Sequence, residues 1–342
     1  MIRQVTWGEI MRIMNQESGK KKSRKWIGRG VLMILLMISL FFYRDTLWNI
    51  LEGIRRVTWG ELVGSICLAF LGYSLDGLTI SIMTRAVGSK AKVRDGIFIA
   101  FVCEFYRLTT LGNGSGIAEI HYLHEKGVEL GSATVLTMIQ FALKRMAVML
   151  LGLTGFVYLC HKEVTKVLCS EYRVFVGIGC LIAVIVIFFY LCLALYSKVA
   201  NGLVWVLDWL AARIKTQEKN FEKWKEQIRL LNRSGRCILA QKKKILCVIL
   251  LQIGKLMAFY MIPAWLLRGK TDLTIVECVL VMAVAFMLAG VIPTPSGVGA
   301  LEFVFVLFFT SFTDSGTAVP AILLFRFVTW ICPAIVGGVL LL

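Results

Sequence analysis

Charged side chains that interrupt long apolar runs are the residues of this sequence best suited to chemistry. Eight residues do so: Asp76, Glu104, Arg107, Lys144, Arg145, Lys255, Glu302 and Arg326. At the centre of a membrane helix each would cost roughly 2.5–3.5 kcal/mol, so each must face a partner or a hydrated cavity. Three acids against five bases predict an excess of positive charge. An anionic ligand, most simply a phosphate-bearing lipid headgroup, would balance it.

The types of the basic residues suit a phosphate. Arginine holds a phosphate through two parallel hydrogen bonds, which favours Arg145 and Arg326, whereas Lys144 and Lys255 would act as point charges. Ion pairs offer a structural alternative, since Glu104 and Arg107 lie one helical turn apart. For any single residue this alternative is as good as a binding role. The excess of bases favours a site for the group as a whole.

A glycine pattern with a glutamate occurs twice. Gly114, Gly116 and Glu119 form one G-x-G-x-x-E, and Gly297, Gly299 and Glu302 form the other. Arg145 follows the first glutamate by 26 residues and Arg326 follows the second by 24. The N-terminus of a half-helix at membrane depth presents free N–H groups to an anion, and transporters are built in this way.

The same glycine pattern has a structural explanation. Its glycines can permit close helix packing, and its glutamates can complement the helix dipole. Ser296, directly before the second copy, can cap the next helix. We take the lipid-binding candidates to be Arg326, Arg145, Lys144, Lys255, Glu302, Glu119, Gly297, Gly299, Gly114, Gly116, Ser296, Glu104 and Arg107.

The composition predicts an all-α polytopic membrane protein. The 342 residues are 58% apolar and 17% charged, against about 45–50% and about 25% in soluble domains. This excludes a disordered chain, a disulfide scaffold and an ordinary cytosolic enzyme. Ten cysteines without a C-x-x-C pair argue against a zinc site, and we expect no cofactor and no metal. The net charge of +17 is better explained by topology and anionic lipids than by nucleic acid.

The apolar blocks predict about 7–9 membrane segments. They cover about 27–43, 60–84, 96–112, 131–158, 174–197, 245–267, 273–293, 297–312 and 317–342. Two of them, 96–112 and 297–312, are short and bordered by glycines. We expect 96–112 to return with 117–130 as a re-entrant hairpin from the cytoplasmic side. We expect 273–293 and 297–312 to form a second hairpin from the opposite side.

Basic residues predict the orientation. Segments 1–26, 85–94 and 198–244 contain 23 Lys and Arg, whereas the loops on the other side contain eight. By the positive-inside rule the N-terminus is cytoplasmic, in a multi-pass protein of the cell membrane.

The opposite orientations of the two hairpins predict an inverted repeat. A basic segment, 1–26, would precede a membrane domain over 27–342. Within that domain the repeats would cover about 60–197 and 245–342, joined by an amphipathic cytoplasmic linker, 198–244, on the inner leaflet.

The stretch Val291–Glu302, VIPTPSGVGALE, and the later Leu324-Phe325-Arg326 resemble a known family. They are similar to the P-x-G-x-G-x-x-E stretch and last span of the lysylphosphatidylglycerol synthase family, also called multiple peptide resistance factor. The resemblance covers most of the chain. The first copy departs from the pattern, because Gly112-Asn113 stands where a proline is usual.

The resemblance implies a flippase-like function. In full-length members a cytoplasmic domain transfers an aminoacyl group from tRNA to phosphatidylglycerol, and the membrane domain is regarded as a flippase for the product. We expect no acyltransferase domain here, so the family label of phosphatidylglycerol lysyltransferase would not describe this chain. The implied partners are the membrane and phosphatidylglycerol or its aminoacyl ester. A homodimer and a separate lipid-modifying enzyme stay open.

Other classes are disfavoured by particular residues. A membrane-embedded polyprenyl-diphosphate phosphatase could use Glu125 and Glu129 on one helical face with the Ser296 hydroxyl, but the Ser-Arg-Ser of such chemistry is missing. His121, His124 and Glu125 would supply three zinc ligands without a fourth. Interior Lys and Arg disfavour a cation channel. A structural membrane scaffold would make the buried charges inessential.

Overall fold

The computed structural model describes residues 57–110, 114–162, 240–292 and 299–341, with several residues within 170–188 and 235–238. All regular secondary structure in these residues is helical, so the expected all-α architecture is confirmed for them. The expected first span, 27–43, lies outside them. Most of the expected linker, 198–244, and residues 293–298 also lie outside them.

Each half of the chain contains the same order of helices: long, short, short, long. The first half comprises α3 (Trp59–Ala86), α4 (Val93–Thr109), α5 (Gly114–Glu125) and α6 (Leu130–Cys160). The second comprises α10 (Lys242–Leu266), α11 (Ile275–Ala289), α12 (Ala300–Phe309) and α13 (Ser315–Arg326), which continues through a π-helical turn, η2 (Phe327–Ile331), into α14 (Cys332–Leu340). In each half the first and the last helix are long and apolar enough to cross a membrane, with α13, η2 and α14 taken as one helix.

The long helix α3 begins at a capping box that the sequence predicts from its Thr-x-x-Glu pattern. The hydroxyl of Thr58 accepts from the N–H of Glu61, and the carboxylate of Glu61 accepts from the N–H of Thr58 at 2.9 Å. Two of the orphan N–H groups at the helix start are thereby satisfied. Thr274 and Glu277 begin α11 in the same way.

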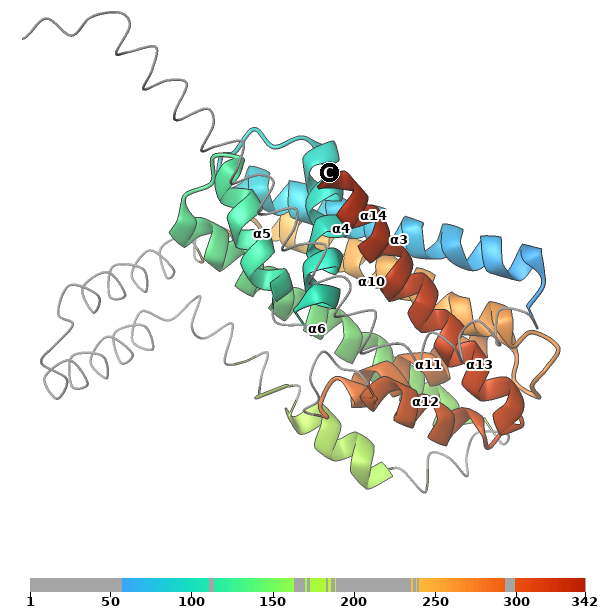
Figure 1. Ribbon diagram of the computed structural model, residues 1–342. Coiled ribbons are helices and arrows are strands. Elements are labelled where there is room, and N and C mark those ends of the chain that lie inside the picture. The colour runs from blue at the N-terminus through green and yellow to red at the C-terminus, as the bar shows by residue number, and fades with distance from the viewer. Residues whose placement is uncertain are drawn as a thin grey trace, which may run out of the picture.

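The first long helices of the two halves, α3 and α10, lie side by side and run antiparallel (Figure 1). Their pairing starts with Glu61 against Lys270 and ends with Ala86 against Gln241. Between these ends Gly72 faces the Phe259 ring. Glycine removes the side chain at this position, so the aromatic ring packs directly on the backbone of α3.

The short helices form two hairpins whose open ends lie at opposite ends of the molecule. Lys126, after α5, pairs with Asp95, at the start of α4, at 2.7 Å. The hydroxyl of Ser89 donates to the Lys126 carbonyl, at the end where α3 finishes and α10 begins. The hairpin α4–α5 therefore starts and finishes at that end.

The second hairpin, α11–α12, opens at the other end. The hydroxyl of Thr313, after α12, donates to the Lys270 carbonyl at 2.7 Å, and that of Thr271, before α11, donates to the Phe312 carbonyl at 3.2 Å. Lys270 also pairs with Glu61 at the start of α3. The two hairpins thus enter the helix bundle from opposite directions.

Packing between the halves follows a two-fold pattern. α6 of the first half packs against the short helix α11 of the second, through Gly152 on Met287 and Gly155 on Leu280. In the reverse exchange, α14 of the second half packs against the short helix α4 of the first, through Gly337 on Phe101 (Figure 1). Each half therefore covers the other half's hairpin.

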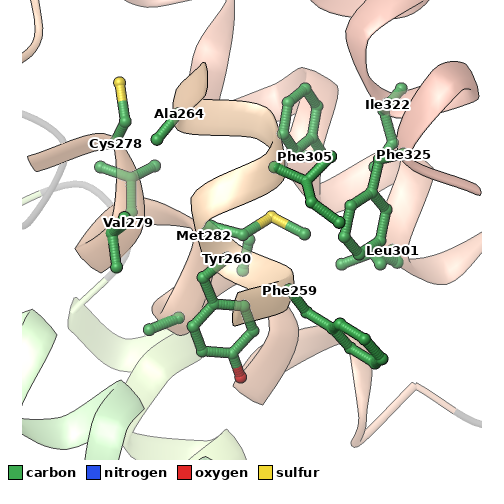
Figure 2. Packing of buried hydrophobic residues seen from close by; sticks show 14 of the residues in the cluster. Phe259, Tyr260, Ala264, Cys278, Val279, Met282, Leu301, Phe305, Ile322 and Phe325 are labelled. Carbon is green, nitrogen blue, oxygen red and sulfur yellow. The ribbon is translucent and has the colours of Figure 1, made fainter. Parts of the chain in front are cut away.

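The largest buried apolar cluster fills the second half. Figure 2 shows Tyr260 of α10, Met282 of α11, Phe305 of α12 and Phe325 of α13 converging on one core. All four side chains are 2% exposed or less. A smaller cluster packs α3, α4, α5 and α6 around Ile99 and Leu136. The hairpins are thus held by apolar packing as well as by their end contacts.

A glycine at the crossing of α3 and α4 should tolerate no side chain. A Cβ at Gly77 would lie 2.5 Å from the Ile97 Cα, so one of the two backbones must move. We expect Gly77→Ala to lower the free energy of unfolding in detergent by about 1–3 kcal/mol.

The matched control for this change is Gly60→Ala on the same helix, where a Cβ meets nothing within 4 Å. Alanine is the better helix former, so this variant should unfold no more easily than wild type. Equal loss in both variants would show that the approach of α3 to α4 does not limit stability.

Candidate functional site

An ion pair joins α3 to α10 in the middle of their contact. The ammonium of Lys255 lies 2.6 Å from the Asp76 carboxylate, and the amide of Gln252 donates to the other oxygen of that carboxylate at 3.0 Å. The Lys255 side chain is 2% exposed. Lys255 and Gln252 thus both bind the Asp76 carboxylate inside the apolar bundle, where a charge needs such partners.

A second pair lies on α4, the entering helix of the first hairpin. The guanidinium of Arg107 binds the Glu104 carboxylate at 2.8 Å, one helical turn away, as the sequence spacing predicts. Glu104 is 3% exposed. The neighbouring Tyr73 of α3 donates its hydroxyl to the Thr329 carbonyl of the π-helical turn at 2.6 Å.

Two further charges reach the same region from α5 and α6. Lys144 interacts electrostatically with Lys255, Arg107, Asp76 and Glu104. Glu119 interacts with Asp76, Lys144 and Lys255. Together the charged residues Asp76, Glu104, Arg107, Glu119, Lys144 and Lys255, with the neutral Gln252 bound to Asp76, form what we call the interior charge cluster.

Several polar atoms in this cluster have no hydrogen-bond partner among the described residues. They are the second carboxylate oxygen of Glu104, one oxygen of Glu119 and the amide oxygen of Gln252. Lys144 likewise forms no ion pair within the part of the chain that the structure describes. Because buried polar groups are otherwise nearly always hydrogen-bonded, these atoms mark a place where a polar ligand can bind.

The charge balance of the interior differs from the sequence expectation. Glu119 was expected to bind ligand as part of the first glycine pattern but was not counted among the interior charges, and α5 places it in the cluster. The cluster therefore contains three acids and three bases. Because it has no excess of bases, its unpartnered atoms and not surplus charge indicate a ligand.

Glu302 and Arg326, expected to bind ligand, form a separate pair between α12 and α13. The guanidinium of Arg326 binds the Glu302 carboxylate through Nε at 2.8 Å and Nη2 at 3.0 Å. The same carboxylate accepts from the Gly299 N–H at 2.9 Å. The Arg326 guanidinium also lies 4.9 Å from the centre of the Trp330 ring. Both side chains therefore have partners within the chain.

Arg145 turns away from its neighbour Lys144. Its guanidinium donates to the Gly290 carbonyl, after α11, at 3.1 Å and lies over the Phe141 ring. A cation suits this position because the C-terminal end of a helix is partly negative. Arg145 thus ties α6 to the second hairpin.

The two glycine patterns adopt different local structures. Gly114 opens α5 with its N–H bonded to the Thr110 hydroxyl at 2.7 Å. Gly299 precedes α12 with φ +84°, a conformation that favours glycine. Both N–H groups are satisfied within the chain. A Cβ at Gly116 would lie 3.9 Å from the Thr137 methyl group, which is an ordinary contact. Ser296 and Gly297 lie outside the described residues.

The glutamates of the phosphatase alternative do not share a helical face. Glu125 ends α5 and pairs with His121 at the surface, whereas Glu129 caps α6 beyond a turn at Gly127, where φ is +83°. The expectation of one face is wrong because glycine ends the helix between them. His124 bonds to the Val128 carbonyl.

The sequence analysis identified most residues of the interior charge cluster but missed its neutral residue, Gln252. Glu104, Arg107, Glu119, Lys144 and Lys255 come together, and Asp76, recognised as an interior charge but not taken as a binding candidate, joins them. Gln252 was overlooked. It lies three residues before Lys255 and so shares its helical face, a signal present in the sequence.

Family comparison covers nearly the whole chain. The family model described as lysylphosphatidylglycerol synthase TM region matches residues 26–337. The chain belongs to this family. The match includes all of α3 to α13 and both hairpins of this family member, and it confirms the resemblance seen in the second glycine pattern. No curated protein matches the chain.

Breaking the Asp76–Lys255 pair at the centre of this lysylphosphatidylglycerol synthase TM region should destabilise the fold. Lys255→Met removes the cation from the buried Asp76 carboxylate and should lower the free energy of unfolding in detergent by about 3–5 kcal/mol. Adding Asp76→Asn should restore most of that loss, because no uncompensated charge then remains.

Lys270→Met is the matched control. Lys270 pairs with Glu61 between the same two helices but is 41% exposed, so its loss should cost about 1 kcal/mol or less. If Lys255→Met were as mild as Lys270→Met, the interior of the bundle would be hydrated and the pair dispensable.

Proposed function

We propose that this membrane protein moves an anionic or aminoacylated phospholipid between the leaflets of the bilayer. The observation that supports this most directly is the interior charge cluster, where oxygens of Glu104, Glu119 and Gln252 have no hydrogen-bond partner among the described residues. Lys144 forms no ion pair with any of these residues either. A lipid headgroup offers both a phosphate for an ammonium and donors for carboxylates. Family membership points to a phospholipid as the ligand.

The helix arrangement supports an inverted repeat with two re-entrant hairpins. The short helices have 17, 12, 15 and 10 residues, and at about 1.5 Å per residue each is shorter than the roughly 30 Å apolar core of a bilayer. α3 and α10 run antiparallel, and the hairpins open at opposite ends. This is the arrangement in which transporters place a binding site near the midplane.

The proposed orientation places the open end of α4–α5 in the cytoplasm. With the native reactive thiols replaced by serine, Lys90→Cys and Lys126→Cys should react with a membrane-impermeant maleimide from the cytoplasmic side. Asp272→Cys and Asp314→Cys should react from the opposite side. Labelling of Lys90→Cys and Asp272→Cys from one side would contradict the inverted repeat.

Lipid movement itself is tested with purified protein in liposomes. We expect wild type to accelerate transbilayer movement of fluorescent phosphatidylglycerol or its lysyl ester over that of a polyprenyl phosphate. Lys144→Met should slow this movement about tenfold or more, since loss of one charge-assisted contact is about 1.5–3 kcal/mol.

The matched control is Lys243→Met, an exposed lysine at the start of α10. It should transport as wild type does, and both variants should elute and unfold as folded protein. A folded Lys144→Met protein with full activity would overturn the role of the cluster. Release of phosphate from a polyprenyl diphosphate, without lipid movement, would support the phosphatase instead.

A further inference from the structure

Glu119 differs from the other acids of the interior charge cluster. Asp76 is paired with Lys255 and Glu104 with Arg107, whereas Glu119 forms no ion pair with any residue that the structure describes. One of its carboxylate oxygens is buried without a hydrogen-bond partner. Its negative charge is therefore the least compensated in the cluster.

The groups around Glu119 come from every helix packed on α5 and from the two helices behind. α6 contributes Lys144 and the Thr137 hydroxyl, and α4 contributes the Cys103 thiol. Asp76 of α3 and Lys255 of α10, elsewhere in the cluster, interact electrostatically with the Glu119 carboxylate.

On α4, Glu104 adds a second buried carboxylate oxygen without a partner, on a side chain that is 3% exposed. The Arg107 guanidinium pairs with the other oxygen of Glu104. The region thus has acceptor oxygens for which no described residue supplies a donor.

The charge balance of the cluster limits what can bind there. With all six groups ionised the cluster is neutral, so a lipid phosphate brings one uncompensated negative charge into an apolar interior, where such a charge is strongly unfavourable. A proton on Glu119, the carboxylate of the cluster without an ion pair among the described residues, restores neutrality without breaking either ion pair.

We infer that Glu119 takes up a proton when an anionic lipid headgroup binds beside Lys144, so that lipid movement is coupled to a proton gradient. This rests on the proposed lipid translocation. The proton comes from water, binds the Glu119 carboxylate and leaves with the lipid on the other side. Lipid and proton therefore move in the same direction, and an anionic lipid accumulates in the leaflet that faces the more alkaline compartment.

Proton uptake is measured on the detergent-solubilised full chain. Binding of dioctanoyl phosphatidylglycerol is followed by titration calorimetry in two buffers of different ionisation enthalpy. We expect uptake of about one proton per lipid by wild type and none by Glu119→Gln, which keeps the shape of the side chain. Glu125→Gln, an exposed glutamate of the same helix, should take up the proton as wild type does.

Transport under a pH gradient separates the two proposals. In liposomes with a difference of one pH unit, phosphatidylglycerol should accumulate about tenfold on the alkaline side with wild type, as expected for one proton per lipid. With Glu119→Gln it should equilibrate between the leaflets.

Lipid movement by wild type without proton uptake would overturn the inference and leave the translocator standing. Proton uptake on lipid binding without transbilayer movement would overturn the translocator and keep the proton site. Wild-type protein that takes up no proton overturns the inference whatever the behaviour of the variants.

Discussion

A charge buried among apolar helices needs an opposite charge beside it, and the arrangement of this protein depends on that constraint. Lys255 of α10 and Asp76 of α3 meet at 2.6 Å in the middle of the longest helix contact. Because the pair and its Gln252 neighbour lie on one face of each helix, they favour one register of α3 on α10. The antiparallel direction of these helices then determines the ends from which the two hairpins enter.

Short hairpins serve this arrangement because they bring charged residues inward from a helix end. α4 delivers Glu104 and Arg107, and α5 delivers Glu119, to the region that the long helices α3, α6 and α10 surround. In a straight span, charged residues one turn apart would share one face of the helix and lie at nearly the same depth in the membrane. A hairpin folded into the bundle instead lets acids from two helices face bases from two others, in an environment that excludes most water.

The two glycine patterns show how repeated sequence can acquire different roles. In the second copy Glu302 caps its own helix and binds Arg326 through an ion pair and a hydrogen bond. In the first copy Glu119 lies in the second turn of α5 and interacts electrostatically with Lys144, and neither forms an ion pair with a described residue. Arg145, the basic residue first matched with Arg326, contacts α11 instead. In the second copy the glutamate and the arginine bind each other, whereas the first copy leaves polar groups available to a ligand.

The sequence by itself determined the class, the helices and the interior charges, because hydropathy, capping patterns and charge placement act locally along the chain. The Thr58 capping box, the span around Asp76 and the Glu104–Arg107 pair could all be read in this way. Only the tertiary structure decided which charges meet. Glu119 entered the cluster, and Arg326 was neutralised by Glu302. Those outcomes depend on how separate helices pack, which residue spacing does not encode.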